Sequence, residues 1–149
     1  MIKEKEFLFW AVFFRLANFY TDKNINIHKS DFDSNSSYIV NKNTWLYIKT
    51  SSKRNSPWTF TFSKENQDEI QELKNKFWSV FIILVCKDDG IVSLSFDELK
   101  HILDYDHEET EWIRVMRKKG EKYMVYWHDG ELPYKIWDNE FPKKIIDVL

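Results

Sequence analysis

The chain has 149 residues, of which 43% are hydrophobic and 17% aromatic, and its formal net charge at pH 7 is −2. This length and composition predict a single domain, residues 1–149, with enough apolar side chains for a packed core. The near-neutral charge excludes a general attraction to nucleic acid or anionic lipid, so any such binding needs a local patch. A single cysteine, Cys86, excludes an internal disulfide and a cysteine-based zinc site, and it favours a reducing, cytoplasmic setting.

The N-terminal segment Lys3–Tyr20 is predicted to form a helix that is apolar on two faces. Such a helix is either enclosed in the core or docked against a partner, so a homodimer contact through the helix at 7–20 is one hypothesis. The continuous apolar run at 7–14 is too short to span a bilayer and is followed by no cleavage site. We therefore expect no signal peptide and no membrane contact. One face contains Phe7, Trp10, Phe13, Phe14 and Ala17, and the other contains Phe9, Val12 and Leu16.

Apolar periodicity and turn residues predict the remaining elements in chain order. Residues 21–37 are polar and form an expected long loop with a short strand at Ile25–His28. The run at 78–86 is almost wholly apolar, which is typical of a central strand covered on both faces. Further expected strands lie at 38–40, 44–50, 58–62 and 91–94, with a hairpin of 112–117 and 123–127, and further expected helices lie at 64–76, 95–103 and within 141–149.

The stretch 44–62 brings cations, hydroxyl groups and a tryptophan close together. Lys49 lies inside the first predicted strand, Lys53 and Arg54 lie on the polar turn, and Trp58 begins the next strand. Cations beside an aromatic ring can bind a phosphate backbone and stack a base. Lys49, Lys53, Arg54 and Trp58 are therefore the candidate nucleic-acid-binding residues. The alternative is that the two turn cations are merely solvated and that Trp58 belongs to the core.

A second basic group lies on the predicted later hairpin, and it would strengthen the nucleic-acid hypothesis if it shared a face with the first. The sequence leaves that question open. The group contains Arg114, Arg117, Lys118, Lys119 and Lys122.

The order helix, three strands, helix, central strand, with Lys49 in the second strand, resembles the core of the PD-(D/E)xK nuclease superfamily over residues 3–86. The resemblance implies an α+β fold in which helices flank a central mixed sheet. This is a restriction-endonuclease-like αβββαβ core, to which residues 87–149 add a C-terminal β-hairpin extension. In that superfamily two acids bind Mg²⁺, and the lysine helps to activate water and to stabilise the developing phosphate charge.

The resemblance places the catalytic lysine at Lys49. The acid expected two positions earlier is replaced by Tyr47, and a neutral phenol is a poor ligand for Mg²⁺ at pH 7. Asp33 is the candidate metal ligand. The resemblance therefore implies an eroded metal site, and we expect Mg²⁺ as a cofactor only if the chain is a nuclease. Other candidates for the missing acids are Asp31, Glu4 and Glu6.

Three functions follow as hypotheses. The first is a nucleic-acid-associated protein, a catalytically degenerate nuclease-like module that binds DNA or RNA. The second is a protein-interaction module, such as an immunity or regulatory protein, that works through exposed aromatic side chains and the acidic run at 104–111. The third is an active Mg²⁺-dependent nuclease. The chain lacks a glycine-rich phosphate loop, which argues against a P-loop NTPase or a dinucleotide enzyme.

Overall fold

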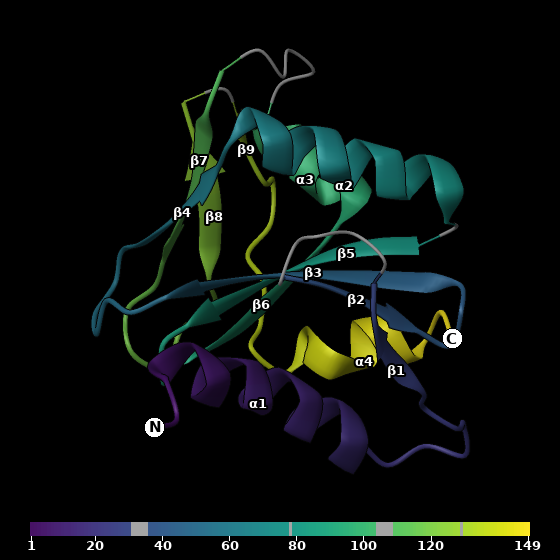
Figure 1. Ribbon diagram of the computed structural model, residues 1–149. Coiled ribbons are helices and arrows are strands. Elements are labelled where there is room, and N and C mark those ends of the chain that lie inside the picture. Colours follow the sequence, from purple (N-terminus) through teal and green to yellow (C-terminus); the bar gives the residue numbers. More distant parts are fainter. Residues whose placement is uncertain (31–35, 78, 104–108, 129) are drawn as a thin grey trace.

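The computed structural model describes residues 1–30, 36–77, 79–103, 109–128 and 130–149. The described residues form an α+β protein with four helices, a five-stranded mixed sheet and a four-stranded antiparallel sheet (Figure 1). The α+β class expected from the sequence is therefore confirmed.

The central sheet has the strand order β1 (Ile27–Lys29), β2 (Ser37–Val40), β3 (Thr44–Ser51), β5 (Ser79–Cys86) and β6 (Gly90–Ser95). Strands β3 and β5 are parallel, and every other neighbouring pair is antiparallel. Nearly every residue of β3 and β5 is buried, because both faces of this pair are covered. The predicted mixed central sheet is thus confirmed.

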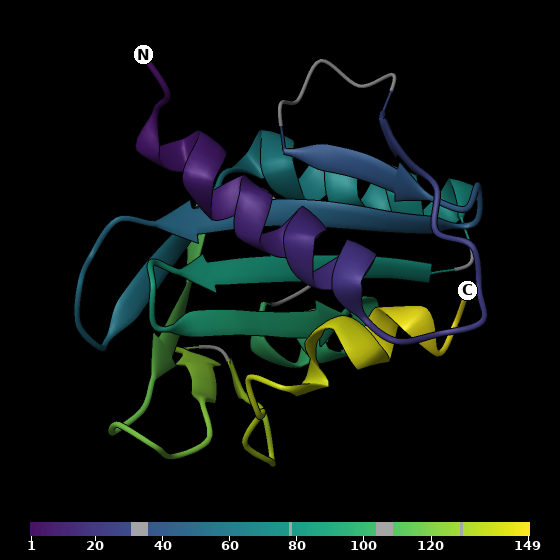
Figure 2. The same cartoon turned by 90° about the horizontal axis from the view of Figure 1, so that it is seen from below.

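Helices cover the two faces of the central sheet. Figure 1 shows α1 (Glu4–Asn18) and α4 (Glu140–Ile146) below the sheet, and α2 (Lys64–Lys76) and α3 (Phe96–Ile102) above it. The view from below in Figure 2 shows α1 and α4 lying across the strands. The hydroxyl groups of Ser63 and Ser95 accept backbone N–H hydrogen bonds at the starts of α2 and α3, which fixes where these helices begin.

The second sheet corrects the expected arrangement of the strands. It has the order β4 (Trp58–Phe62), β7 (Glu111–Met116), β8 (Met124–Trp127) and β9 (Gly130–Glu131). We expected β4 to be the third strand of the central sheet, but it pairs antiparallel with β7. The physical reason is its alternation: Trp58, Phe60 and Phe62 are buried and the two threonines between them are exposed. A strand with one apolar and one polar face suits a sheet with one face in water.

The expected hairpin forms between β7 and β8, so the C-terminal extension supplies three of the four strands of the second sheet. The inner face of this sheet packs, with α2 and α3, above the central sheet in one core cluster. The helix α1 buries Phe9, Val12 and Leu16 and leaves Phe7, Trp10 and Phe14 exposed, which distinguishes its two apolar faces. No helix in the described part of the chain combines the length and apolar character needed to cross a bilayer.

A buried carboxylate joins α3 to the C-terminal segment. Lys144 Nζ donates to Glu98 Oε1 at 2.8 Å, and Tyr134 Oη donates to Glu98 Oε2 at 2.6 Å. The Glu98 side chain is only 9% exposed. Burial alone would raise the pKa of Glu98, but the hydrogen bonds from Lys144, the Ser95 backbone and Tyr134 outweigh it and lower the pKa.

We expect Glu98→Gln to lower the free energy of unfolding at neutral pH by about 2 kcal/mol, because hydrogen bonds to a charged acceptor are lost. The pKa of Glu98 is lower in the folded state than the unfolded value of about 4.3, so its contribution is complete above that value. The contribution disappears as the pH falls through the folded pKa. Urea unfolding of both proteins above and below about pH 4 measures the difference, which should shrink in acid. The matched control is Glu72→Gln, which removes a carboxylate from an exposed ion pair. A loss of unfolding free energy in Glu98→Gln that is the same at both pH values would contradict this account.

Candidate nucleic-acid interface

The loop at 52–57 and the turn between β7 and β8 lie side by side. The register between β4 and β7 pairs Trp58 with Val115, so the loop that precedes β4 meets the residues that follow β7. The Arg117 backbone N–H donates to Ser56 Oγ at 3.1 Å. A hollow of about 300 Å³ is lined by Arg54, Arg117 and Lys119, together with Asp89 and loop residues. Members of the two basic groups found in the sequence, Arg54 from the first and Arg117 and Lys119 from the second, therefore share one end of the molecule.

A second hollow, of about 470 Å³, adjoins the first through Ser56 and Arg117. The cations that line the two hollows outnumber the acids, which are Asp89 and Glu121. We call this region, together with the exposed Lys53, the basic end. The cations lining its two hollows are Arg54, Arg117, Lys118, Lys119, Lys122 and Lys135.

Arg117 anchors the basic end to the central sheet. Its Nε lies 2.7 Å from Asp89 Oδ2, and its guanidinium lies over the ring of Tyr123 at 4.3 Å. Tyr123 Oη donates to the same Asp89 oxygen at 2.6 Å. Because Asp89 is engaged by Arg117 and Tyr123, its charge offsets little of the positive charge on the loop and turn lysines. Arg117 thus positions the turn, while the exposed Lys118 and Lys119 present charge to solvent.

Trp58 takes a structural position rather than the stacking position expected from the sequence. Its side chain is 1% exposed, and its ring packs edge-on against Tyr123 with centroids 6.1 Å apart. The indole Nε1–H donates to the Lys53 carbonyl oxygen at 2.8 Å. In this structure the ring offers no open face to a base. It instead fixes the loop that presents Lys53 and Arg54, and Lys53 Nζ itself donates to the Pro57 carbonyl at 2.9 Å.

Lys49 points away from the basic loop and toward the start of α2. Its Nζ donates to Asn66 Oδ1 at 2.8 Å and lies 5.2 Å from the centroid of the Phe62 ring. Asn66 Nδ2 in turn donates to Tyr47 Oη at 2.9 Å. Burial lowers the pKa of Lys49, the positive charge of Lys5 lowers it further, and Glu69 acts in the opposite direction. Lys49 is thus a half-buried cation held by neutral oxygen and ring partners.

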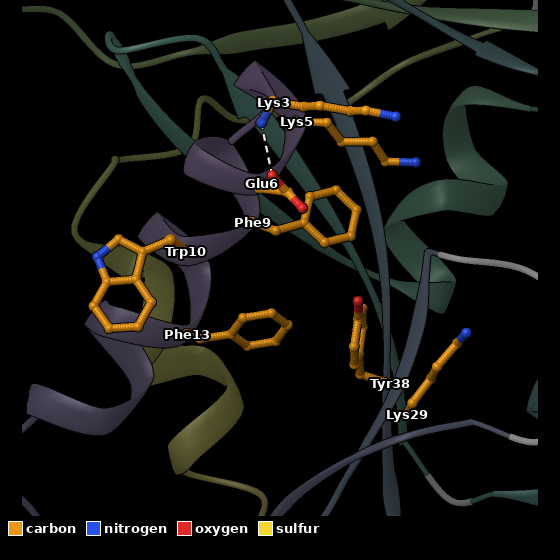
Figure 3. A pocket seen from close by; sticks show the side chains of 8 residues that line it. All are labelled: Lys3, Lys5, Glu6, Phe9, Trp10, Phe13, Lys29 and Tyr38. Atoms are coloured by element: carbon orange, nitrogen blue, oxygen red, sulfur yellow. Dashed lines mark hydrogen bonds between the residues drawn. The ribbon is translucent and has the colours of Figure 1, made fainter. Parts of the chain in front are cut away.

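A further hollow, of about 440 Å³, lies between α1 and the strands β1 and β2. Figure 3 shows Lys3 and Lys5 extending from the start of α1 and Lys29 projecting beside Tyr38 from β1. The walls are aromatic, with Phe13 and Tyr38 edge-to-face at 4.9 Å between centroids. Lys5 also raises the positive potential around Lys49. Sequence spacing could not reveal this group, because Lys5 and Lys29 line one hollow only through the packing of α1 on the sheet.

The described residues do not fit a magnesium site. Tyr47 occupies the expected acid position, Glu4 pairs with Lys87 at 2.6 Å, and Glu6 accepts from the Lys3 backbone at 2.6 Å. Within the described ranges no group of three His, Cys, Asp or Glu side chains is placed to bind a metal ion. Asp31 and Asp33 lie outside the described residues, as does most of the acidic run, residues 104–108. We derive no metal-dependent step.

Two other features of the sequence have structural positions. Cys86 is buried at the end of β5, and burial raises the pKa of its thiol, so it is a core residue and not an activated nucleophile. Asn66 was not singled out in the sequence, although its position three residues after Ser63 is the signal of a capping box.

Comparison with known proteins finds no family model, no curated protein and no solved structure that matches this chain. The resemblance to the PD-(D/E)xK superfamily therefore stays a prediction.

We expect Lys49→Met to leave the free energy of unfolding at neutral pH unchanged or raised, because methionine removes a half-buried ammonium group from the core edge. Asn66 Oδ1 still accepts from the Ser63 backbone N–H at 3.1 Å in this variant. The difference in free energy of unfolding between Lys49→Met and the wild type should become smaller as the pH rises toward about 10.4. Near that pH the wild-type lysine is also uncharged. Chemical denaturation at several pH values measures this.

The contrasting variant is Asn66→Ala. It removes the hydrogen bonds to Tyr47 and to the start of α2, and we expect it to destabilise the protein by about 1 kcal/mol. If Lys49→Met destabilises the protein as much as Asn66→Ala, the Lys49 ammonium stabilises the fold, and the expected cost of burying its charge is wrong.

Proposed function

We propose that this protein binds nucleic acid through the basic end. The observation that supports the proposal is the meeting of the 52–57 loop with the β7–β8 turn, which joins two basic groups that are about 60 residues apart in the sequence. Phosphate contacts by lysine and arginine supply most of the affinity of sequence-independent nucleic-acid binding. A net charge of −2 does not oppose this, because seven of the 22 lysines and arginines lie at the basic end.

The fold we propose behind this function is a degenerate PD-(D/E)xK-type core. The parallel β3–β5 pair between an N-terminal helix and α2, with Lys49 on β3, supports the analogy. The neutral Tyr47 and Asn66 beside Lys49 support the loss of metal chemistry. Lys3, Lys5 and Lys29, which line the hollow beside α1, then provide a second cationic group for a phosphate backbone, without a catalytic role.

We expect Lys53→Ala/Arg54→Ala to weaken the binding of DNA and RNA oligonucleotides at low salt. Each lost phosphate contact reduces the slope of log affinity against log salt by about one, so the double variant should reduce it by about two. Fluorescence anisotropy of labelled oligonucleotides across a salt series gives both quantities. The control is Lys76→Ala/Lys143→Ala, which removes the same charge from exposed ion pairs on α2 and α4. Equal losses for both double variants would mean that net charge, and not the basic end, determines binding.

The active-nuclease alternative has its own test. An active nuclease should cleave an oligonucleotide in Mn²⁺, and EDTA should stop the cleavage. Loss of this cleavage in both Lys49→Ala and Asp33→Asn would establish catalysis in place of binding alone. Cleavage retained in both variants would come from a contaminant or from another site.

A protein contact is a second candidate function, and one observation favours it. Phe7, Trp10 and Phe14 on α1 are 58%, 62% and 50% exposed and form one stripe, with the rings of Trp10 and Phe14 5.9 Å apart. Exposed aromatic stripes of this kind are typical of protein interfaces. We propose a homodimer through α1 as the simplest form of this contact.

Light scattering tests the dimer. We expect a wild-type mass of two chains that falls to one in Trp10→Ser/Phe14→Ser, because serine removes most of the apolar area of the stripe. A monomeric wild type at high micromolar concentration would rule out the dimer and leave the stripe to another protein.

A further inference from the structure

The outer face of the second sheet is open to solvent. No helix covers this face in Figure 1, where β4, β7 and β8 stand at the edge of the molecule. Alternating residues point outward: Thr59 and Thr61 are exposed on β4, and Trp112 and Met116 on β7 are each 37% exposed. Arg114 lies between them and pairs across the sheet with Thr59 on one side and Tyr126 on the other. We call these outward residues of β4, β7 and β8 the sheet face.

Aromatic rings and a guanidinium gather at one end of the sheet face. The rings of Trp112 and Trp127 lie 5.6 Å apart between centroids and are tilted by 45°. The Arg114 guanidinium lies 5.7 Å from the Trp127 centroid, and His128 lies 4.4 Å from the same ring. Trp127 is partly buried against the core, whereas Trp112 and His128 are exposed, and exposed planar side chains are the groups on which unpaired bases stack.

The sheet face runs without interruption into the basic end. Along β7 the outward positions Trp112, Arg114 and Met116 succeed one another at intervals of about 6.8 Å, as expected for alternate residues of a strand. Beyond Met116 the chain continues into Arg117 and Lys118. Met116 and Met124, which pair across β7 and β8, line the same hollow as Lys118 and Lys122. An aromatic platform and a cationic groove thus form one continuous surface.

We propose that this surface binds single-stranded nucleic acid, with unpaired bases stacked on Trp112 and its neighbours and the backbone held by the basic end. This inference rests on the proposed nucleic-acid function and adds the class of ligand. The lysines beside Met116 and Met124 complement a polyanion, and Glu131, opposite Tyr126, is an exposed acid at the other end. The mixture of aromatic rings, threonines and arginine differs from the purely apolar stripe on α1. A duplex encloses its bases and presents only phosphates and base edges, so it would engage the basic end without the rings.

The test compares an unpaired oligo-dT or oligo-U strand with a duplex of the same length, by anisotropy across a salt series. We expect Trp112→Ala to weaken single-strand binding by about tenfold at every salt concentration. The salt slope should stay unchanged because no charge is removed. Duplex binding should also stay unchanged. Trp112→Phe should restore most of the affinity, because phenylalanine also has a ring on which a base can stack. The matched control is Tyr20→Ala, which removes a fully exposed aromatic side chain at the far end of α1.

The outcomes separate this inference from the function on which it rests. If single strands and duplexes bind equally, and Trp112→Ala has no effect while Lys53→Ala/Arg54→Ala does, the stacking surface is wrong and the basic end stands. A Trp112→Ala loss that Trp112→Phe does not restore also overturns stacking. If no oligonucleotide binds at low salt, both proposals fail and the sheet face is left to a protein partner.

Discussion

The parallel pairing of β3 with β5 is the constraint on which the rest of the structure depends. Eight consecutive residue pairs join the two strands, from Thr44 with Ser79 to Ser51 with Cys86. Both faces of this pair are covered, since nearly all of its residues are buried. Helices α1 and α4 cover one face, and α2, α3 and the second sheet cover the other. After Ser51 the chain leaves the central sheet, and β4 joins the second sheet. The loop between these two strands is part of the basic end.

Two aspartates, one at the turn after β5 and one in the C-terminal segment, tie the outer parts of the chain to the central sheet. Asp89 accepts from both Arg117 and Tyr123, so the turn end of the β7–β8 hairpin is fixed to the end of β5. Asp138 accepts from Arg15 of α1 at 2.9 Å and from the Ile91 backbone at 2.9 Å. Hydrogen bonds to buried or half-buried carboxylates are among the stronger polar contacts in proteins. The turn that carries Lys118 and Lys119 is therefore anchored to the central sheet through Arg117.

The sequence predicts the elements of this fold well and their assembly only in part. Helical spacing locates α1 and α2, and the unbroken apolar run locates β5. The alternation of Trp58, Phe60 and Phe62 already indicated a strand with one face in water, which suits the second sheet better than the centre of the first. We nevertheless placed this strand in the central sheet, because it follows β3 in the chain. Strand partners depend on long-range contacts, and no local pattern specifies that β4 meets β7.

The candidate site shows the same division between local and long-range information. Lys53 and Arg54 lie on an exposed loop, as turn residues usually do. From the sequence, the Trp58 indole could either stack on a ligand or fill the core. The structure buries it against Tyr123, a contact that no local pattern specifies. The approach of the β7–β8 turn to the loop is a tertiary contact that the sequence left open. The resemblance to the PD-(D/E)xK superfamily singled out Lys49. It did not specify Asn66, which binds Lys49, or Lys5, whose charge repels it.

The environment of Lys49 bears on the nucleic-acid binding that we propose. A half-buried ammonium is ordinarily stabilised by a carboxylate, and its pKa then rises or stays near its normal value. Here the pKa of Lys49 is lowered, because burial and the charge of Lys5 exceed the attraction of Glu69. The Lys49 ammonium donates a hydrogen bond to the neutral side chain of Asn66, which itself donates to Tyr47. An anion beside Lys49 would offset the repulsion from Lys5. A phosphate backbone would supply that charge at Lys49 without any metal ion.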